Sequence, residues 1–408
     1  MPGADPKSTK LWGKGGKVDA AVEAFTSGDD IPFDQVLVPF DCRGSIAHAR
    51  MLGKMGLLEA PEVHQLVAAL EEIITLHRQG GFIIRPDQED CHTAIEAYLT
   101  EQLGETGQKI HTARSRNDQV LTALRLYYRD ELESIRKAIK RVMTSLDEVI
   151  ARQGKVRMPG YTHTRKAMPS TVRLWLGAFR DALKDDRRFL KAVHKLVDQS
   201  PLGSAAGYGV PLKIDRAFTA RELGFERVQR NAMYVQHSRG KFEAAILHAM
   251  SQILFDLNRL SGDLILFSMP GFGYVDLPPA FCTGSSIMPQ KHNPDVLELV
   301  RGHYHQVIAL EHQLLSTMAN LISGYHRDAQ LTKGPVMTGL TVTRRCLEIM
   351  APLLAGLQVN KGRCEADLSE ELFAAESAYA LVREGIPFRE AYRQVAQRYH
   401  RDGGDDEI

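Results

Sequence analysis

The sequence predicts an all-α protein built around long helices, and three observations lead to this prediction. Apolar residues recur at steps of three and four over segments well beyond the roughly 11–12 residues of an average helix. The alternation of apolar and polar residues that marks a strand is nearly absent, and only residues 81–86 suggest one short hairpin arm. Glycine and proline gather between the apolar segments, where connecting loops are expected.

Five long helices follow from the apolar stripes. In the first, Leu132, Ile135 and Ile139 mark the seam of a packed helix. In the second, Asp186 interrupts an otherwise apolar stripe. The predicted ranges are residues 120–153, 172–197, 241–267, 294–320 and 336–357. Helices that are this long, and apolar along more than one line, are typical of an extended bundle whose remaining apolar surface is buried by other subunits.

Long loops separate these helices. Loops of this length are uncommon unless they are functional, so we expect chemistry in them. They cover residues 158–169, 201–212, 270–294 and 321–335. We expect an N-terminal helical domain, a central long-helix bundle, and a C-terminal helical domain whose tail is disordered from Arg401. Their predicted ranges are residues 1–115, 116–357 and 358–408.

The composition excludes several classes of protein. The 408 residues include 51 Lys and Arg against 50 Asp and Glu, a net charge of +1, so we expect neither nucleic acid nor a membrane as a partner. No stretch of about 18 apolar residues occurs, and residues 1–17 lack the apolar core of a secretory signal. The five cysteines are widely spaced and odd in number, which indicates a reducing compartment, and we expect the cytoplasm.

Polar side chains first gather in residues 109–119, directly before a predicted helix. Arg114 and Arg116 flank Ser115, and either Ser115 or Asn117 suits the N-cap position. A helix N-terminus beside two arginines is a ready site for a carboxylate. The alternative is a capped helix start whose arginines are solvated.

Three later segments also carry candidate chemistry. His163 stands between two threonines in a turn, where it suits proton transfer, although a lone histidine in a turn is more often structural. Ser285 and Lys291 lie in the Gly- and Ser-rich residues 283–294, which suit a mobile loop that closes over a substrate or a plain linker. The polar residues 323–333 suit either a binding loop or a solvated connection.

Taken together and in this order, these segments resemble the fumarase/aspartase superfamily of β-eliminating lyases. Residues 284–294 are similar to the signature of the superfamily, and residues 111–119 and 159–163 are similar to its argininosuccinate lyase branch in particular. Shorter agreements lie at residues 11–13, 201–204 and 385–391, so the resemblance spans about residues 11–398. It implies a homotetramer with a 20-helix core, five helices from each subunit, and active sites that are each shared between three subunits.

The resemblance also implies a reaction and a role for each matching residue. The reaction is β-elimination that cleaves argininosuccinate to arginine and fumarate, a step of arginine biosynthesis. Ser285 is the implied base and His163 the implied proton donor, with Glu298 as the carboxylate partner of His163 and Lys291 stabilising the Ser285 alkoxide. The implied substrate-binding residues are Ser115, Arg116, Asn117, Thr162, Asn293, Tyr325, Gln330 and Lys333. We expect no metal and no cofactor, because amides and cations can stabilise the developing charge.

The sequence departs from the family pattern at several positions. Met168 stands where many members of the branch have Gln, His292 replaces a basic residue of the signature, and Ala113 replaces Gly. Residues 374–376 read Ala-Ala-Glu in place of Ala-Thr-Asp, and Gly28 stands where a substrate-binding Ser is frequent. None of these positions is an implied catalytic residue, so the departures concern substrate preference more than the reaction.

Met168 leaves open a variant that acts on a related arginine or citrulline conjugate, and two further alternatives also stay open. The first is another lyase of the superfamily, such as adenylosuccinate lyase or fumarase, which would not be expected to carry the run at residues 114–119. The second is a catalytically silent, crystallin-like structural protein. The presence of Ser285, His163 and Lys291 argues against the silent protein, since loss of any one of them would be its simplest sign.

Overall fold

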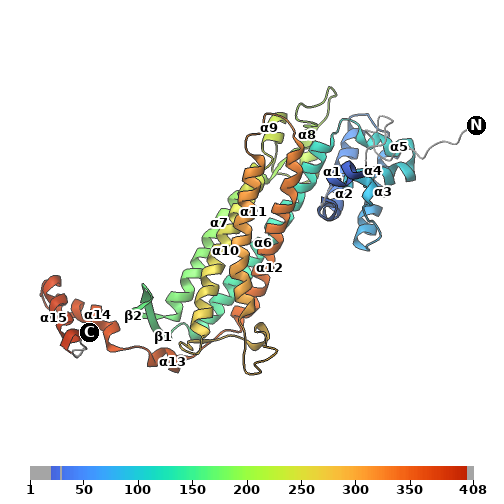
Figure 1. The fold of residues 1–408 in the computed structure, drawn as a ribbon. Helices are drawn as coiled ribbons and strands as arrows, with labels where there is room; N and C mark the ends of the chain where they lie inside the picture. The colour runs from blue at the N-terminus through green and yellow to red at the C-terminus, as the bar shows by residue number, and fades with distance from the viewer. Residues whose placement is uncertain (1–19, 28–29, 402–408) are drawn as a thin grey trace, which may run out of the picture. The chain divides into compact units, whose positions relative to one another are not determined.

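The structure, a computed structural model, describes residues 20–27 and 30–401 (Figure 1). These residues form two compact units. The first unit comprises residues up to 136 together with 188–251 and 305–343. The second unit comprises residues 137–187 and 252–304 together with those from 344 onward. Each of the five long helices therefore contributes one segment to each unit.

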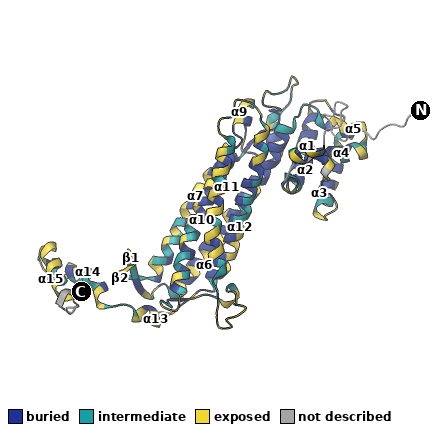
Figure 2. Ribbon diagram, viewed as in Figure 1, coloured by how far each residue is buried: buried dark blue, intermediate teal, exposed yellow. Residues whose placement is uncertain are grey.

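All five predicted long helices are confirmed, and so is the all-α fold class. Their observed bounds differ from the predicted ones by at most four residues. They are α6 (Arg116–Gln153), α7 (Val172–Val197), α10 (Lys241–Ser268), α11 (Asp295–Met318) and α12 (Lys333–Ala355). The predicted stripe of Leu132, Ile135 and Ile139 is fully buried, which agrees with its role as a packing seam. Figure 2 shows the buried residues of these helices concentrated on the faces that meet neighbouring helices.

Further helices complete the first unit. They are α1 (Ala20–Ser27), α2 (Ile31–Lys54), α3 (Ala60–Arg78), α4 (Cys91–Leu103), α5 (Glu105–Gln108), α8 (Arg216–Glu222) and α9 (Ala232–His237). One of them, α2, is as long as α11. Asp90 caps α4 by accepting the Thr93 N–H at 2.7 Å. Two residue pairs, β3 (Gln199–Ser200) and β4 (Arg227–Val228), form a short parallel ladder. A cluster of buried apolar residues, which includes Leu126, Leu202 and Phe225, packs against Val228 of β4.

The second unit adds an antiparallel hairpin and three short helices to its long-helix segments. The hairpin pairs β1 (Arg157–Thr162) with β2 (Arg165–Thr171). A second antiparallel pair joins β5 (Val275–Asp276) to β6 (Gln358–Val359). The helices are α13 (Lys361–Ala366), α14 (Ala374–Arg383) and α15 (Phe388–Arg401).

Two local predictions were wrong. Residues 158–169, expected as a loop, lie within the β1–β2 hairpin, whose strands lack the alternating apolar pattern that marks a half-buried strand. Residues 81–85, expected as a hairpin arm, form no strand. The Gln35 side chain takes the place of a partner strand there, because it donates to the Phe82 carbonyl at 2.8 Å and accepts the Ile84 N–H at 3.0 Å.

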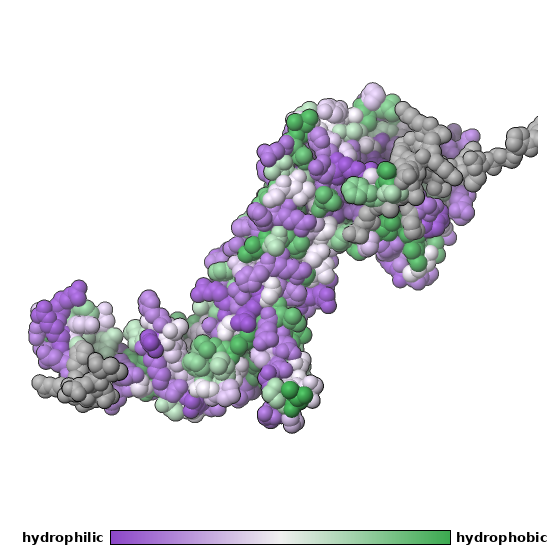
Figure 3. All heavy atoms as spheres, viewed as in Figure 1, coloured by the Kyte–Doolittle hydropathy of each residue, from purple (hydrophilic) through white to green (hydrophobic). Residues whose placement is uncertain are grey.

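Two predictions about cysteines and membranes can be compared with the described residues. All five cysteines are free, and four of them are buried. None of the described helices has the length and apolar character that crossing a membrane requires. On the face drawn in Figure 3, hydrophobic side chains are scattered among hydrophilic ones. Arg401, where the predicted disordered tail begins, is the last residue of α15, and the rest of that tail and the Gly28 position lie outside the described residues.

Candidate active site

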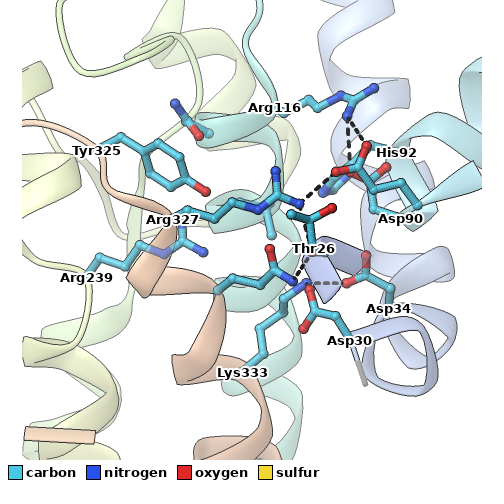
Figure 4. Close-up of a pocket in the computed structure, with 14 residues that line it drawn as sticks. Thr26, Asp30, Asp34, Asp90, His92, Arg116, Arg239, Tyr325, Arg327 and Lys333 are labelled. Carbon is cyan, nitrogen blue, oxygen red and sulfur yellow. Dashed lines mark hydrogen bonds and ion pairs between the residues drawn. The ribbon is translucent and has the colours of Figure 1, made fainter. Parts of the chain in front are cut away.

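A cavity of about 400 Å³ in the first unit has a strongly charged wall (Figure 4). Four acidic residues, three arginines, one lysine and one histidine line it: Asp30, Asp34, Glu89, Asp90, Arg116, Arg239, Arg327, Lys333 and His92. Five predicted substrate-binding residues also line it, namely Arg116, Asn117, Tyr325, Gln330 and Lys333. The structure therefore brings together two motifs that lie more than 200 residues apart in the sequence.

The N-terminus of α6 reaches this cavity in a fixed conformation. Ser115 is the residue before the helix, and its Oγ accepts the Asn117 N–H at 3.3 Å, so Ser115 is the N-cap. Asp118 is fully buried, and its carboxylate accepts the Ser115 N–H at 3.0 Å. The same carboxylate accepts the Gly203 N–H at 2.8 Å and the Ala205 N–H at 2.9 Å. Asp118 thus fixes the start of α6 to the loop at residues 201–212.

Lys333 is held by two carboxylates from the N-terminal part of the sequence, those of Asp30 and Asp34. Its Nζ contacts Asp30 and lies 2.6 Å from an oxygen of the buried Asp34. Burial would lower the pKa of Lys333, but the charges of Asp34 and Asp30 raise it above its ordinary value. Burial also raises the pKa of Asp30 to about 6, with Lys333 opposing and Asp34 adding to the rise. The ammonium is therefore cationic and neutralised by its neighbours.

A second ion-pair group lies on the same wall. Arg327 donates to Glu89 at 2.8 Å and to the Thr26 carbonyl at 2.8 Å. Arg116 lies 3.4 Å from Asp90 and 3.6 Å from Glu89. Gln330 donates to the same Thr26 carbonyl at 3.0 Å. Figure 4 shows Arg116 and Arg327 extending toward the region of Asp90 from different segments of the chain.

One residue of this wall, His92, belongs to a buried ion pair with Asp41. Asp41 Oδ2 lies 3.0 Å from His92 Nδ1, and Gln119 donates to both oxygens of Asp41 at 2.9 and 3.0 Å. Burial would lower the pKa of His92, but Asp41 raises it overall. Burial would likewise raise the pKa of Asp41, but His92 lowers it overall. Both directions describe an imidazolium paired with a carboxylate.

The Ser285 loop belongs to the second unit. Thr283 and Asn293 close its neck with two backbone hydrogen bonds, of 3.0 and 2.8 Å. Ser285 Oγ accepts the Ile287 N–H at 3.4 Å and the Met288 N–H at 3.2 Å. Two backbone donors aimed at one hydroxyl oxygen favour negative charge on that oxygen.

His163 lies at the tip of the β1–β2 hairpin, also in the second unit. His163 and Thr164 are the two residues between the paired Thr162 and Arg165, and both have positive φ, 53° and 60°. Such a turn favours Asn or Gly, and positive φ in a β-branched residue such as Thr is unusual. The neighbouring strands hold the turn in this strained conformation, and strain of this kind clusters at functional sites. His163 is exposed at the tip.

The predicted site residues are therefore divided evenly between the units. The first unit holds Ser115, Arg116, Asn117, Tyr325, Gln330 and Lys333; the second holds Thr162, His163, Ser285, Lys291, Asn293 and Glu298. Lys291 and Glu298 are exposed. Within the described part of the second unit, no hydrogen bond or ion pair joins His163 to Ser285, Lys291 or Glu298.

Sequence reasoning missed several residues of the cavity wall. Asp30, Asp34 and Arg239 lie outside every motif that was singled out, and only their placement in the fold brings them to the wall. Asp90 had a usable signal, because an acidic residue directly before a helix is a typical N-cap, but no helix was predicted after it.

Comparisons with known proteins also indicate a lyase. A family model described as a lyase matches residues 14–309. An argininosuccinate lyase of Thermotoga neapolitana is 52% identical over 97% of this chain and 99% of its own length. An argininosuccinate lyase of Sorangium cellulosum is 45% identical over 95% of this chain and 90% of its own length.

Solved structures agree on the fold. An EDDS lyase in complex with formate has a TM-score of 0.79 at 24% identity, covering 96% of this chain and 78% of its own. A class II fumarase from Schistosoma mansoni has a TM-score of 0.77 at 16% identity, covering 92% of this chain and 88% of its own. The sequence relatives, with their high identity over nearly the whole length, identify the branch. This chain belongs to the argininosuccinate lyase family of the fumarase/aspartase superfamily, and it is an enzyme of the lyase class.

Proposed function

We propose that this lyase cleaves argininosuccinate to arginine and fumarate, with Ser285 as the base. The observation that carries the proposal is the pair of N–H donors, from Ile287 and Met288, that converge on Ser285 Oγ. A serine hydroxyl is a poor base unless its alkoxide is stabilised, and these two donors supply part of that stabilisation. Lys291, six residues further along the same loop, adds a positive charge when the loop closes.

The elimination begins at the carbon next to a succinyl carboxylate. Ser285 removes the proton from that carbon, and the carboxylate then carries a second negative charge. Lys291 and Asn293 stabilise this dianion from the loop. The loop is largely exposed, so its closure over substrate would exclude water from the reacting atoms.

Departure of the guanidinium nitrogen needs a proton. The pKa of the product guanidinium lies far above neutral pH, so arginine leaves as a cation. His163 supplies or orients that proton, and Glu298 is its carboxylate partner in the assembled site. The position of His163 at the tip of a constrained hairpin supports this role, since the turn fixes its backbone.

The cavity of the first unit binds the rest of the substrate. The N-terminus of α6, with Ser115, Arg116 and Asn117, suits the succinyl carboxylates, and Thr162 adds a hydroxyl. Tyr325, Gln330 and Lys333 bind the arginine half. The acidic residues of the wall suit the positive groups of that half.

The working form is a homotetramer in the cytoplasm, with each active site shared between three subunits. Helices of 24 to 38 residues separate the motifs along the chain, so several subunits are needed to bring six residues of each unit to one substrate. Exposed apolar side chains on the long helices, such as Leu174, Leu299 and Leu315, supply surface for such contacts. The free cysteines suit a reducing compartment.

The direct test is to mix the purified protein with argininosuccinate and follow fumarate absorbance, with adenylosuccinate and malate as alternative substrates. Fumarate from argininosuccinate alone is the expected result. Turnover of adenylosuccinate or malate instead would reject the proposed substrate. No turnover of any of the three would favour the silent, crystallin-like alternative.

A further inference from the structure

Arg239 differs from the other basic side chains of the cavity wall. Arg116, Arg327 and Lys333 each lie against at least one carboxylate. Arg239 lies between α9 and α10, is only 5% exposed, and has no ion pair with any described residue. Its Nε and Nη1 atoms are buried and lack a hydrogen-bond partner among the described residues.

A buried cation of this kind is expected to meet an anion. Buried charges are costly unless they are paired, and a guanidinium presents its donors in a planar fork that matches a carboxylate. The Arg239 guanidinium carbon lies 5.4 Å from the centre of the Tyr325 ring. That cation–π contact orients the fork, and Asp30, the one described acidic residue of the wall whose charge interacts with Arg239, is already paired with Lys333. Figure 4 shows Arg239 and Tyr325 side by side on the cavity wall.

We infer that Arg239 binds the α-carboxylate of the arginine half of the substrate. This inference rests on the proposed function, under which the substrate has three carboxylates. Two belong to the succinyl half, for which α6 and the Ser285 loop already provide partners. The third belongs to the arginine half, and Arg239 contacts Tyr325, which binds that half.

Under this inference, Arg239 makes the site specific for ligands that carry the α-carboxylate of the amino acid. Without an α-carboxylate, the ligand would leave the buried guanidinium unpaired, and a site with an unpaired buried polar group rejects such an analogue strongly. Arginine and agmatine, its decarboxylated form, differ in this group alone. They are therefore matched probes for Arg239.

The experiment measures equilibrium binding of arginine and of agmatine by calorimetry, and inhibition of argininosuccinate cleavage by each. The proteins are the wild type, Arg239→Gln, Arg239→Lys and a control, Arg221→Gln, whose side chain is exposed on α8. Wild type and control should prefer arginine over agmatine by about 10- to 100-fold. Arg239→Gln should lose that preference while agmatine binding stays unchanged, and Arg239→Lys should recover part of it.

Several outcomes would overturn the inference. Equal binding of arginine and agmatine by the wild type would do so, as would an equal loss of both ligands in Arg239→Gln, because Arg239 would then only shape the cavity. An Arg239→Gln protein that binds arginine as tightly as the wild type does would show that Arg239 does not bind the arginine half. If the wild type prefers arginine through Arg239 but does not cleave argininosuccinate, the proposed function fails and the carboxylate site remains.

Discussion

The cavity of the first unit and the Ser285 loop of the second unit hold their functional side chains in different ways. In the cavity, Lys333 and Asp34 are buried and bonded to each other across 299 residues of sequence. In the loop, Lys291 is exposed, and Ser285 Oγ is bound by the amides of residues two and three positions further along. Long-range ion pairs fix the first region, whereas short-range hydrogen bonds shape the second.

Under the proposed function, this difference separates the residues that bind the substrate from those that carry out the reaction. A cavity whose charges are already paired keeps its shape before substrate arrives, so less ordering is needed on binding. A loop held by its own amides can move as a unit and close when the remaining groups of the site are present. Substitutions in the two regions should therefore give different defects, loss of rate in one and loss of stability or affinity in the other.

The largest expected effect is on turnover. Ser285→Ala should lower kcat by about 10²–10⁴, because it removes the base, while substrate affinity changes little. Single-turnover kinetics would separate the two quantities. The neighbouring exposed Ser286→Ala is the control and should retain activity.

Exchange of the substrate's carbon-bound hydrogen with solvent deuterium tests the assignment of Ser285 more directly. Ser285→Ala should abolish this exchange. A variant that still exchanged at the wild-type rate would remove Ser285 as the base and leave His163 as the better candidate.

The second effect tests the ion pairs of the cavity. Lys333→Met leaves Asp30 and Asp34 without their buried cation, and breaking such a pair from one side costs about 3–5 kcal/mol. We expect a large fall in the thermal midpoint together with weaker arginine binding. Lys361→Met, which breaks an exposed pair with Glu365, should cost under about 1 kcal/mol. Similar melting of the two variants would show that the Lys333 cluster does not stabilise the cavity.

Most of the fold could be predicted from the sequence, because helical periodicity is a local signal. The stripe that contains Leu132 and Ile139 needs no knowledge of its packing partner. The β1–β2 hairpin could not be predicted in this way. Its turn at His163 and Thr164 lacks the Gly or Asn that normally marks positive φ, so the pairing of the two strands maintains a turn that its own residues do not favour.

The residues of the candidate site also differ in whether a local sequence signal identifies them. Ser115 was predicted as a possible cap because a cap and its helix are adjacent in sequence. Asp34 and Arg239 could not be found, since each matters only through residues far away in the chain. The role of a buried charge depends on the residue that it contacts, and sequence patterns identify such distant partners poorly.

A third prediction concerns Asp186, a buried carboxyl that, in contrast to Asp34, forms no ion pair with any described cation. Asp186 on α7 interrupts the apolar stripe, and burial, with the nearby charges of Asp256 and Asp185, raises its pKa from 3.8 to about 7. The folded protein thus keeps a proton that the unfolded chain releases near pH 4. The resulting stability is fully present below about pH 4 and is lost as the pH rises to about 7.

Asp186→Asn removes this titration. The variant should melt several degrees above the wild type at pH 8 and close to it at pH 4, as measured by calorimetry at both values. Asp181→Asn, at an exposed position of the same helix, should show no such dependence on pH. A constant difference between Asp186→Asn and the wild type at both pH values would mean that the carboxyl does not change its charge on unfolding.

The smallest effect concerns the strained turn beside His163. Thr164→Gly should stabilise the protein by about 1 kcal/mol, because glycine adopts positive φ without the steric cost that a β-branched residue carries. The same change frees the backbone next to His163, so kcat should fall several-fold while arginine binding in the first unit stays unchanged. Arg165→Gly, at an exposed position without positive φ, is the control and should destabilise the hairpin. If Thr164→Gly raised stability and left kcat intact, the strain would not serve to position His163, and the fixed part of this site would be confined to the cavity.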